Sequence, residues 1–246
     1  AAFADRHRDI EETWARNFTL IEHRVEGASR LGHARRLLVG ATFTQEFAVE
    51  AAALFNPSMV PHPDQGGLDA GDTRFLMTVR AVGEGHVSSV EFRTGTIDAG
   101  GVVDIDPSAE VAVLPSVVSG RYSRAAFRNQ LEDLGGDRTN SDFVLDTLPE
   151  WFSRDELTLT VARLSDERLT RGDAARTIDR LEWIAACTYR VEFPAGSGIR
   201  ERVLMPTAPS ERNGMEDVRM VRFDGADEEP AYLGTYTAFD GRTVAS

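Results

Sequence analysis

Apolar residues near the start of the chain recur at helical spacing. They form one stripe with intervals of four, four, three and four positions: Ile10, Trp14, Phe18, Ile21 and Val25. A second short helix is expected over about 29–38, and a third from Thr44, a suitable N-cap, to Leu54. Asn56-Pro57 should end that helix, because the residue before proline avoids helical backbone. The pattern predicts an N-terminal helical segment over residues 1–54.

The pattern then becomes that of short strands. Residues 74–80 and 87–93 are rich in apolar and β-branched side chains and flank the turn Gly83-Glu84-Gly85. Asp-Gly pairs at 224–225 and 240–241 are typical of turns. Further strands are expected at 102–105, 111–118, 189–193, 202–205, 218–223 and 232–237. Two groups of strands therefore follow the helical segment.

A segment with helical periodicity lies between these two groups of strands. Ser153 and Glu156 match a capping box, with Leu157, Val161 and Leu164 behind it on one face. Asp173 can cap a last helix that ends near Ala185. The chain lacks the βαβ alternation of a parallel sheet. The sequence favours a mainly β fold with helical additions, in which residues 55–246 carry the strands and a helical insertion lies at about 123–187.

Composition and charge limit the expected cellular location and binding partners of the protein. The net charge of −13 disfavours binding to nucleic acid or to anionic membranes, and no apolar run reaches the roughly eighteen residues of a membrane helix. The single cysteine, Cys187, cannot form an internal disulfide, so a cytoplasmic location is expected. All 27 basic residues are arginine, which excludes lysine Schiff-base chemistry in this chain.

Standard catalytic motifs are missing, including a P-loop, a dinucleotide fingerprint and a zinc-binding His-Glu-x-x-His. The histidines show no metal-ligand spacing, so no metal is expected. Carboxylates, arginines, asparagines and aromatics instead gather where predicted strands meet loops, at 55–58, 79–89, 213–219 and 236–242. Sugar sites use such residues to bind hydroxyls and to donate a proton.

Five strings carry a family resemblance through their order and spacing: Leu54–Ser58, Arg80–His86, Phe92–Asp98, Gly214–Arg219 and Tyr236–Gly241. Together they resemble glycoside hydrolase family 130, the mannoside phosphorylases and β-mannosidases. The resemblance covers roughly residues 44–105 and 189–242. The helical regions resemble a longer subgroup of that family.

The resemblance implies a five-bladed β-propeller that cleaves β-mannosides with inversion. Asp217 matches the family's proton donor, while Asn56, Arg80 and Asp240 match substrate-binding positions. Arg242 is a looser match to an arginine that holds phosphate in some members. Phosphorylases use inorganic phosphate as co-substrate and hydrolases use water, and no other cofactor is expected. Which of the two reactions applies stays open.

Roughly two blades of strand pattern are visible, at about four strands per blade. The chain is therefore expected to be an N-terminal portion whose partner is the missing C-terminal half of the propeller. Two other functions stay open: a propeller that binds carbohydrate without cleaving it, and a protein-interaction domain that uses the helices. The apolar stripe of the first helix also suits a homo-oligomer contact.

The candidate residues have structural alternatives. Asp217 can hold a turn or pair with Arg219, and Asn56 before proline is a common turn residue. Arg80 can pair with Glu84 or Glu91. A sugar site instead requires the three candidate side chains to lie within about 10 Å of one another.

Overall fold

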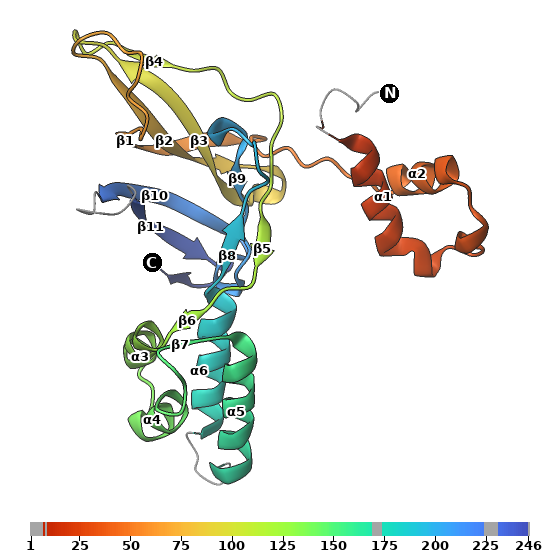
Figure 1. Cartoon of the computed structure of the whole chain (residues 1–246), viewed down its shortest axis with the longest axis vertical. Coiled ribbons are helices and arrows are strands. Elements are labelled where there is room, and N and C mark those ends of the chain that lie inside the picture. The colour runs from red at the N-terminus through yellow and green to blue at the C-terminus, as the bar shows by residue number, and fades with distance from the viewer. Residues whose placement is uncertain (1–6, 8, 169–173, 224–230, 246) are drawn as a thin grey trace. The chain divides into compact units, whose positions relative to one another are not determined.

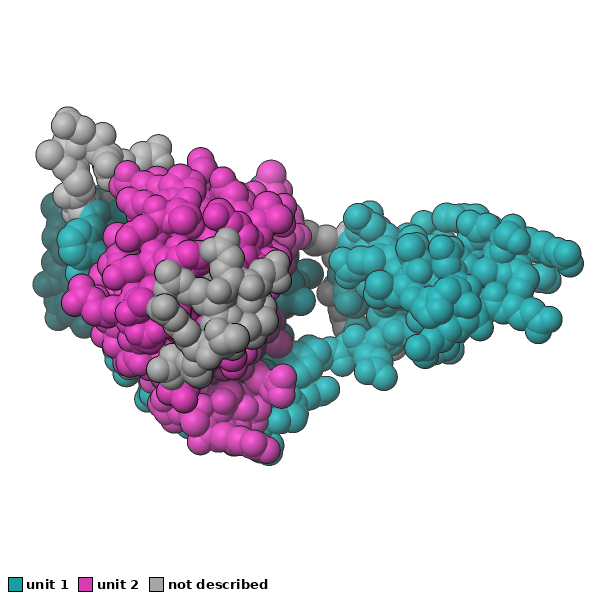
Figure 2. All heavy atoms as spheres, turned by 90° about the horizontal axis from the view of Figure 1, so that it is seen from below, with its two compact units in different colours: residues 1–114, 196–204, 216–236 teal, residues 115–195, 205–215, 237–246 magenta. Residues whose placement is uncertain are grey.

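The computed structural model describes residues 7, 9–168, 174–223 and 231–245 (Figure 1). The chain divides into two compact units (Figure 2). The first comprises Ala1–Leu114, Gly196–Leu204 and Glu216–Tyr236, and the second Pro115–Ala195, Met205–Met215 and Thr237–Ser246. Within the described part of the chain, no helix has the length and apolar character needed to cross a membrane.

The first unit begins with two helices, α1 (Ile10–Ile21) and α2 (His33–Thr42), joined by short 3₁₀ turns. The Asp9 carboxylate caps α1 by accepting a hydrogen bond from the backbone N–H of Glu12, 3.0 Å away. The helices approach closely at Gly40, where a β-carbon would lie 1.9 Å from the carbonyl oxygen of Trp14. Phe18 of the predicted stripe is buried here.

The predicted third helix is wrong, because residues 44–52 are not helical and Leu54 lies in strand β1 (Ala53–Pro61). A helix would join the Ala48 carbonyl to the Ala52 N–H. Instead, the Glu84 N–H donates to the Ala48 carbonyl (3.0 Å) and the Ala52 N–H donates to the Val82 carbonyl (2.9 Å). Tertiary hydrogen bonds to the strands have replaced the internal bonds of the helix.

Strands β1, β2 and β3 form the antiparallel centre of the first unit (Figure 1). The short strands β4 and β9 pair with β3, and β10 and β11 follow β3 in the strand order. Phe75, Met77 and Val79 bury one face of β2. The bounds are β2 Thr73–Val82, β3 Ser88–Ile97, β4 Val103–Ile105, β9 Val203–Leu204, β10 Gly214–Phe223 and β11 Ala231–Phe239.

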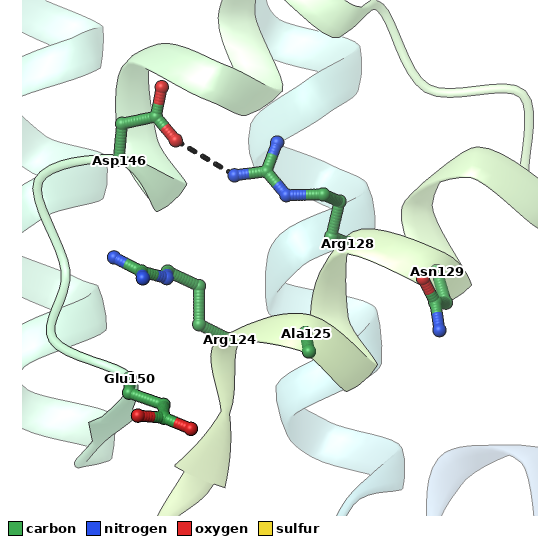
Figure 3. A pocket seen from close by; sticks show the side chains of 6 residues that line it. All are labelled: Arg124, Ala125, Arg128, Asn129, Asp146 and Glu150. Atoms are coloured by element: carbon green, nitrogen blue, oxygen red, sulfur yellow. Dashed lines mark hydrogen bonds and ion pairs between the residues drawn. The ribbon is translucent and has the colours of Figure 1, made fainter.

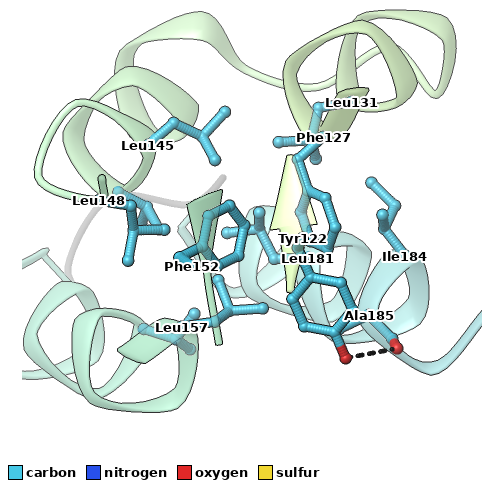
Figure 4. Close-up of a cluster of buried hydrophobic side chains, with 12 residues drawn as sticks. Tyr122, Phe127, Leu131, Leu145, Leu148, Phe152, Leu157, Leu181, Ile184 and Ala185 are labelled. Carbon is cyan, nitrogen blue, oxygen red and sulfur yellow. Dashed lines mark hydrogen bonds between the residues drawn. The ribbon is translucent and has the colours of Figure 1, made fainter. Parts of the chain in front are cut away.

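The second unit contains the helices expected between 123 and 187, and they have a hydrophobic core of their own (Figure 4). Tyr122, Phe127 and Phe152 form an aromatic cluster with ring centroids 5.0–5.5 Å apart. The four helices are α3 (Arg124–Asp133), α4 (Arg138–Leu145), α5 (Arg154–Arg168) and α6 (Ala174–Cys187). Two small antiparallel two-stranded sheets accompany them: β5 (Ser116–Val118) with β8 (Arg190–Glu192), and β6 (Tyr122–Ser123) with β7 (Trp151–Phe152).

The capping box at the start of α5 is confirmed. The Ser153 N–H donates to the Glu156 carboxylate at 2.7 Å, and the Glu156 N–H donates to the Ser153 hydroxyl at 3.2 Å. Of the predicted strand at 111–118, only β5 is a strand. The predicted cap Asp173 and the turn Asp224-Gly225 lie outside the described residues.

The buried carboxylate of Glu211 connects loops of the second unit. It accepts hydrogen bonds from the Tyr189 hydroxyl (2.9 and 3.0 Å) and from the N–H groups of Thr207 and Ala208 (2.8 and 2.9 Å). The turn at Asp240 leads into a short returning strand, β12 (Val244–Ala245), which pairs antiparallel with the end of β11. The turn residues Asp240-Gly241 are thus followed by a strand that pairs with β11.

The fold is therefore mixed, with both helices and strands prominent, rather than mainly β. The strand pairs between named strands whose register is described are antiparallel, in agreement with the missing βαβ rhythm. The described strands do not close into a ring, and the five-bladed propeller stays a prediction.

Candidate functional site

Two non-glycine residues with left-handed backbone meet in the first unit. Asn56 has φ 48° and Asp217 has φ 56°, a region that residues with a β-carbon seldom occupy. Asn56 lies where β1 bulges between Phe55 and Ser58, and Asp217 lies in β10. The Asn56 side-chain amide donates to Oδ1 of Asp217 at 2.6 Å, across 161 positions of sequence. The unusual backbone at both residues thus coincides with a direct contact between their side chains.

Arg80 of β2 completes this group. Its Nη2 donates to Oε1 of Glu216 at 2.5 Å and its Nε donates to the Ser88 hydroxyl at 2.9 Å. Its Nη1 lies 3.8 Å from Oδ1 of Asp217. The guanidinium also lies over the Phe55 ring, 5.8 Å from its centroid. We name Asn56, Arg80, Glu216 and Asp217 the polar cluster.

The accessibility of the polar cluster differs between its members. The side chains of Arg80 and Glu216 are 23% and 20% exposed, whereas that of Asp217 is 38% exposed. In the described part of the chain, Oδ1 of Asp217 receives the Asn56 amide while Oδ2 has no hydrogen bond. Asp217 is therefore the charged group of the cluster that an external molecule reaches most readily.

Hydrogen bonds between side chains and backbone groups hold β10 against β1 and β2 at this point. Nη1 of Arg219 donates to the Asn56 carbonyl at 2.9 Å, and the Met220 N–H donates to the Ser58 hydroxyl at 3.2 Å. The Thr78 hydroxyl donates to the Val218 carbonyl at 3.4 Å. The side chain and the carbonyl of Asn56 are thus both engaged, which fixes its orientation.

The structure decides between several of the sequence alternatives. Asn56, Arg80 and Asp217 lie together, as the sugar-site hypothesis requires. Arg80 pairs with Glu216 and not with Glu84 or Glu91. Arg219 binds a backbone carbonyl rather than the Asp217 carboxylate. These contacts establish the arrangement of the residues and leave their chemical roles as proposals.

Glu216 is the charged member of the cluster that sequence reasoning missed. Consecutive residues of a regular strand point to opposite faces, so Glu216 and Asp217 would not share a partner in a regular strand. The left-handed backbone of Asp217 breaks this alternation and lets both carboxylates approach Arg80. The signal available in the sequence was the Glu-Asp pair itself, whose first member was not assigned a role.

Asp240 and Arg242 belong to the second unit and are described there separately. The Asp240 carboxylate accepts hydrogen bonds from the N–H and hydroxyl of Thr243 (2.6 and 2.8 Å) and from the Arg242 N–H (2.7 Å). These bonds, those from Thr243 foremost, hold the pKa of Asp240 below its ordinary value. The observed contacts of Asp240 are those of a turn, and its role in sugar binding stays a prediction.

A hollow of about 470 Å³ in the second unit is lined by Arg124, Ala125, Arg128 and Asn129 of α3 and by Asp146 and Glu150 (Figure 3). Its arginines already have protein partners. Nη2 of Arg128 donates to Asp146 at 2.8 Å, and Nη1 of Arg124 donates to the Leu148 carbonyl at 2.8 Å. None of the residues of the polar cluster lines this hollow.

Across residues 7, 9–168, 174–223 and 231–245, no group of three histidine, cysteine, aspartate or glutamate side chains is arranged to hold a metal ion. None of the protein-family models, curated proteins or solved structures compared with this chain matches it. The functional argument therefore depends on the polar cluster and on the sequence resemblance.

Proposed function

We propose that the chain is part of an enzyme that cleaves β-mannosides with inversion, by phosphorolysis or hydrolysis, with Asp217 as proton donor. The observation that carries this proposal is the contact between Asn56 and Asp217, with Arg80 beside them. The family resemblance assigns these three positions to one sugar site from the sequence alone. Their proximity supports that assignment.

In the proposed reaction, Asp217 gives its proton to the oxygen that leaves C1 of the mannosyl residue, directly or through a substrate hydroxyl. The C1–O bond breaks and its electron pair stays on the departing oxygen. An oxygen of phosphate or water forms the new bond to C1 from the opposite face, which inverts the configuration; an attacking water gives one of its protons to a general base on that face. Asn56 and Arg80 are suited to bind sugar hydroxyls, since one offers an amide and the other a guanidinium.

The same proposal includes a five-bladed propeller completed by a C-terminal portion, and a cytoplasmic setting. Inverting glycosidases separate their two carboxyl groups by roughly 6.5–9.5 Å to leave room for the nucleophile. One proton donor from this chain is then sufficient, provided that the rest of the protein supplies the groups that hold the nucleophile on the opposite face of the sugar. The assignment of Arg242 to phosphate and of Asp240 to sugar is not part of the proposal.

The test is incubation of the full-length protein with β-mannobioses, with and without inorganic phosphate. Mannose 1-phosphate formed only with phosphate identifies a phosphorylase, and free mannose formed without phosphate identifies a hydrolase. Release of neither product from any β-mannoside, by a protein that is folded by circular dichroism, contradicts the proposal. Binding of the sugar without cleavage would instead support the non-catalytic alternative.

A further inference from the structure

We infer that Glu216 is a positioning residue, which holds Arg80 so that the guanidinium stays beside Asp217 without covering its Oδ2. The catalytic consequence rests on the proposed function of Asp217. The positioning of Arg80 by Glu216 does not rest on that proposal, because the positions of Glu216, Arg80 and Asp217 can be measured without a substrate. Glu216 touches Arg80 and not the reacting atoms in this arrangement.

Arg80 is held on two sides. Its Nη2 contacts Glu216 at 2.5 Å, and its Nε contacts the fully buried Ser88 at 2.9 Å. The remaining nitrogen, Nη1, stays 3.8 Å from Asp217, beyond hydrogen-bond distance. Arg80 therefore gives its short, charge-assisted contact to Glu216 and only a longer electrostatic contact to Asp217.

The two carboxylates compete for one guanidinium. Arginine binds a carboxylate best through two parallel hydrogen bonds, which occupy both carboxylate oxygens. If Glu216 did not hold Arg80, Asp217 would be the carboxylate within its reach. Both oxygens of Asp217 would then face donors, and neither would be free to approach a glycosidic oxygen or a substrate hydroxyl.

The Asn56 amide contacts the same oxygen of Asp217 that lies nearest Arg80, which is Oδ1. It donates to Oδ1 of Asp217 at 2.6 Å, which orients the carboxylate and leaves Oδ2 without a hydrogen bond among the described residues. Asp217 is more exposed than Arg80 or Glu216, so the free oxygen belongs to the accessible group. Oδ2 is the oxygen that we assign to proton transfer.

The experiment compares crystal structures of the full-length protein and of its Glu216→Gln and Glu216→Ala variants. We expect Arg80 to turn toward Asp217, so that the present 3.8 Å separation contracts to the roughly 2.8 Å of a charge-assisted hydrogen bond and Oδ2 acquires a donor. In kinetics we expect kcat to fall about 10- to 100-fold while KM changes little, as for a misplaced reacting group.

Two further variants separate positioning from general damage. Ser88→Ala removes the other contact of Arg80, and we expect Arg80 to stay on Glu216 with Asp217 unchanged. Glu192→Gln removes a comparable ion pair, with Arg190 at 2.8 Å in β8, and should alter neither kcat nor Arg80. If Ser88→Ala moves Arg80 onto Asp217 while both Glu216 variants leave it in place, Ser88 is the positioning residue and the inference is wrong.

The outcomes also distinguish this inference from the proposed function. An unmoved Arg80 in both Glu216 variants overturns the inference, even if replacement of Asp217 abolishes activity. A moved Arg80 confirms the positioning role of Glu216, even if replacement of Asp217 leaves turnover intact and the proton-donor assignment fails. Should Glu216→Ala not fold, Glu216→Gln and Ser88→Ala decide the question.

Discussion

At the scale of single residues, the polar cluster depends on backbone conformations that most residues with a β-carbon avoid. A left-handed conformation costs on the order of 1–3 kcal/mol at such residues, and less at asparagine and aspartate, whose short polar side chains tolerate it. Asn56 and Asp217 both adopt it, and both use it to direct a side chain into the cluster. Such strain is maintained by the surrounding contacts, here those of Arg219 and Ser58.

Replacement of the proposed proton donor gives the first prediction. Asp217→Asn should lower turnover of unactivated β-mannosides by about two or more orders of magnitude, because an amide cannot donate the carboxyl proton. The variant is isosteric, so its thermal unfolding should stay close to that of the wild type. Asp104→Asn on the exposed strand β4 is the control and should be fully active. Equal turnover in Asp217→Asn and the wild type would reject the assignment.

The strain at Asn56 can be measured separately from its side-chain contact. Asn56→Gly and Asn56→Ala both remove the hydrogen bond to Asp217, but only glycine adopts φ 48° without steric cost. The alanine variant should therefore be less stable than the glycine variant by about 1 kcal/mol in urea unfolding. Both should lose sugar binding to a similar extent. Equal stabilities would show that the backbone is not strained here.

At the scale of secondary-structure elements, the segment 47–52 is held to the strands by a group of charges in which Arg93 and Glu91 are buried and Glu50 is exposed. Arg93 of β3 pairs with Glu91 at 2.8 Å and also with Glu50 of this segment. Glu91 is buried, and its Oε1 has no partner among the described residues. The strands beside it place Val79 of β2 and Val203 of β9 opposite Glu91, so Arg93 and Glu50 are its charged neighbours.

This group predicts a pH-dependent stability. Burial, reinforced by Glu50, raises the pKa of Glu91 to about 7 despite the opposing effect of Arg93. In the unfolded chain Glu91 loses its carboxyl proton near pH 4.5, whereas in the folded chain Glu91 keeps this proton up to about pH 7. The folded state thus binds more protons in this range, and its stability falls as pH rises from about 4.5 to 7, by about 3 kcal/mol at most.

Glu91→Gln tests this expectation, because glutamine resembles the protonated side chain and does not titrate. The free energy of unfolding of the wild type should fall relative to that of the variant as the pH is raised from 5 to 8. The comparison uses the difference between the two proteins, since other groups titrate in both. A constant difference over this range would contradict the raised pKa of Glu91.

At the scale of the whole molecule, the two units have separate hydrophobic clusters. Phe75, Met77 and Val79 form one within the sheet of the first unit, and the core of the second unit includes Phe127 and Phe152. Separate cores allow a defect in one unit to leave the other folded. This organisation has a measurable consequence for local stability.

Phe127→Ala should destabilise the second unit by about 3–5 kcal/mol, because Phe127 is 1% exposed and its removal leaves a cavity. Hydrogen exchange should accelerate in α3, α4 and α6 while β2 and β3 keep their protection. Leu159→Ala, at an exposed position of α5, is the matched control and should change neither the stability of the second unit nor its hydrogen exchange. Equal acceleration in both units would show that they unfold as one.

Periodic features were predictable from the sequence because they depend on neighbours along the chain. The apolar stripe predicted α1, the runs of apolar and β-branched residues beside a glycine turn predicted β2 and β3, and the Ser153–Glu156 spacing predicted the cap of α5. Asn56, Arg80 and Asp217 were also singled out, through the family resemblance rather than through periodicity. Each of these predictions required only residue types and spacings.

Other features were decided by the tertiary structure. Residues 44–52 lost their predicted helix because the strands supply hydrogen-bond partners for Ala48 and Ala52. Glu216 joined the polar cluster because the left-handed backbone of Asp217 breaks the alternation of strand side chains. Both outcomes depend on groups far away in sequence that compete for the same donors and acceptors. A local pattern cannot reveal such partners, since it contains only one side of each contact.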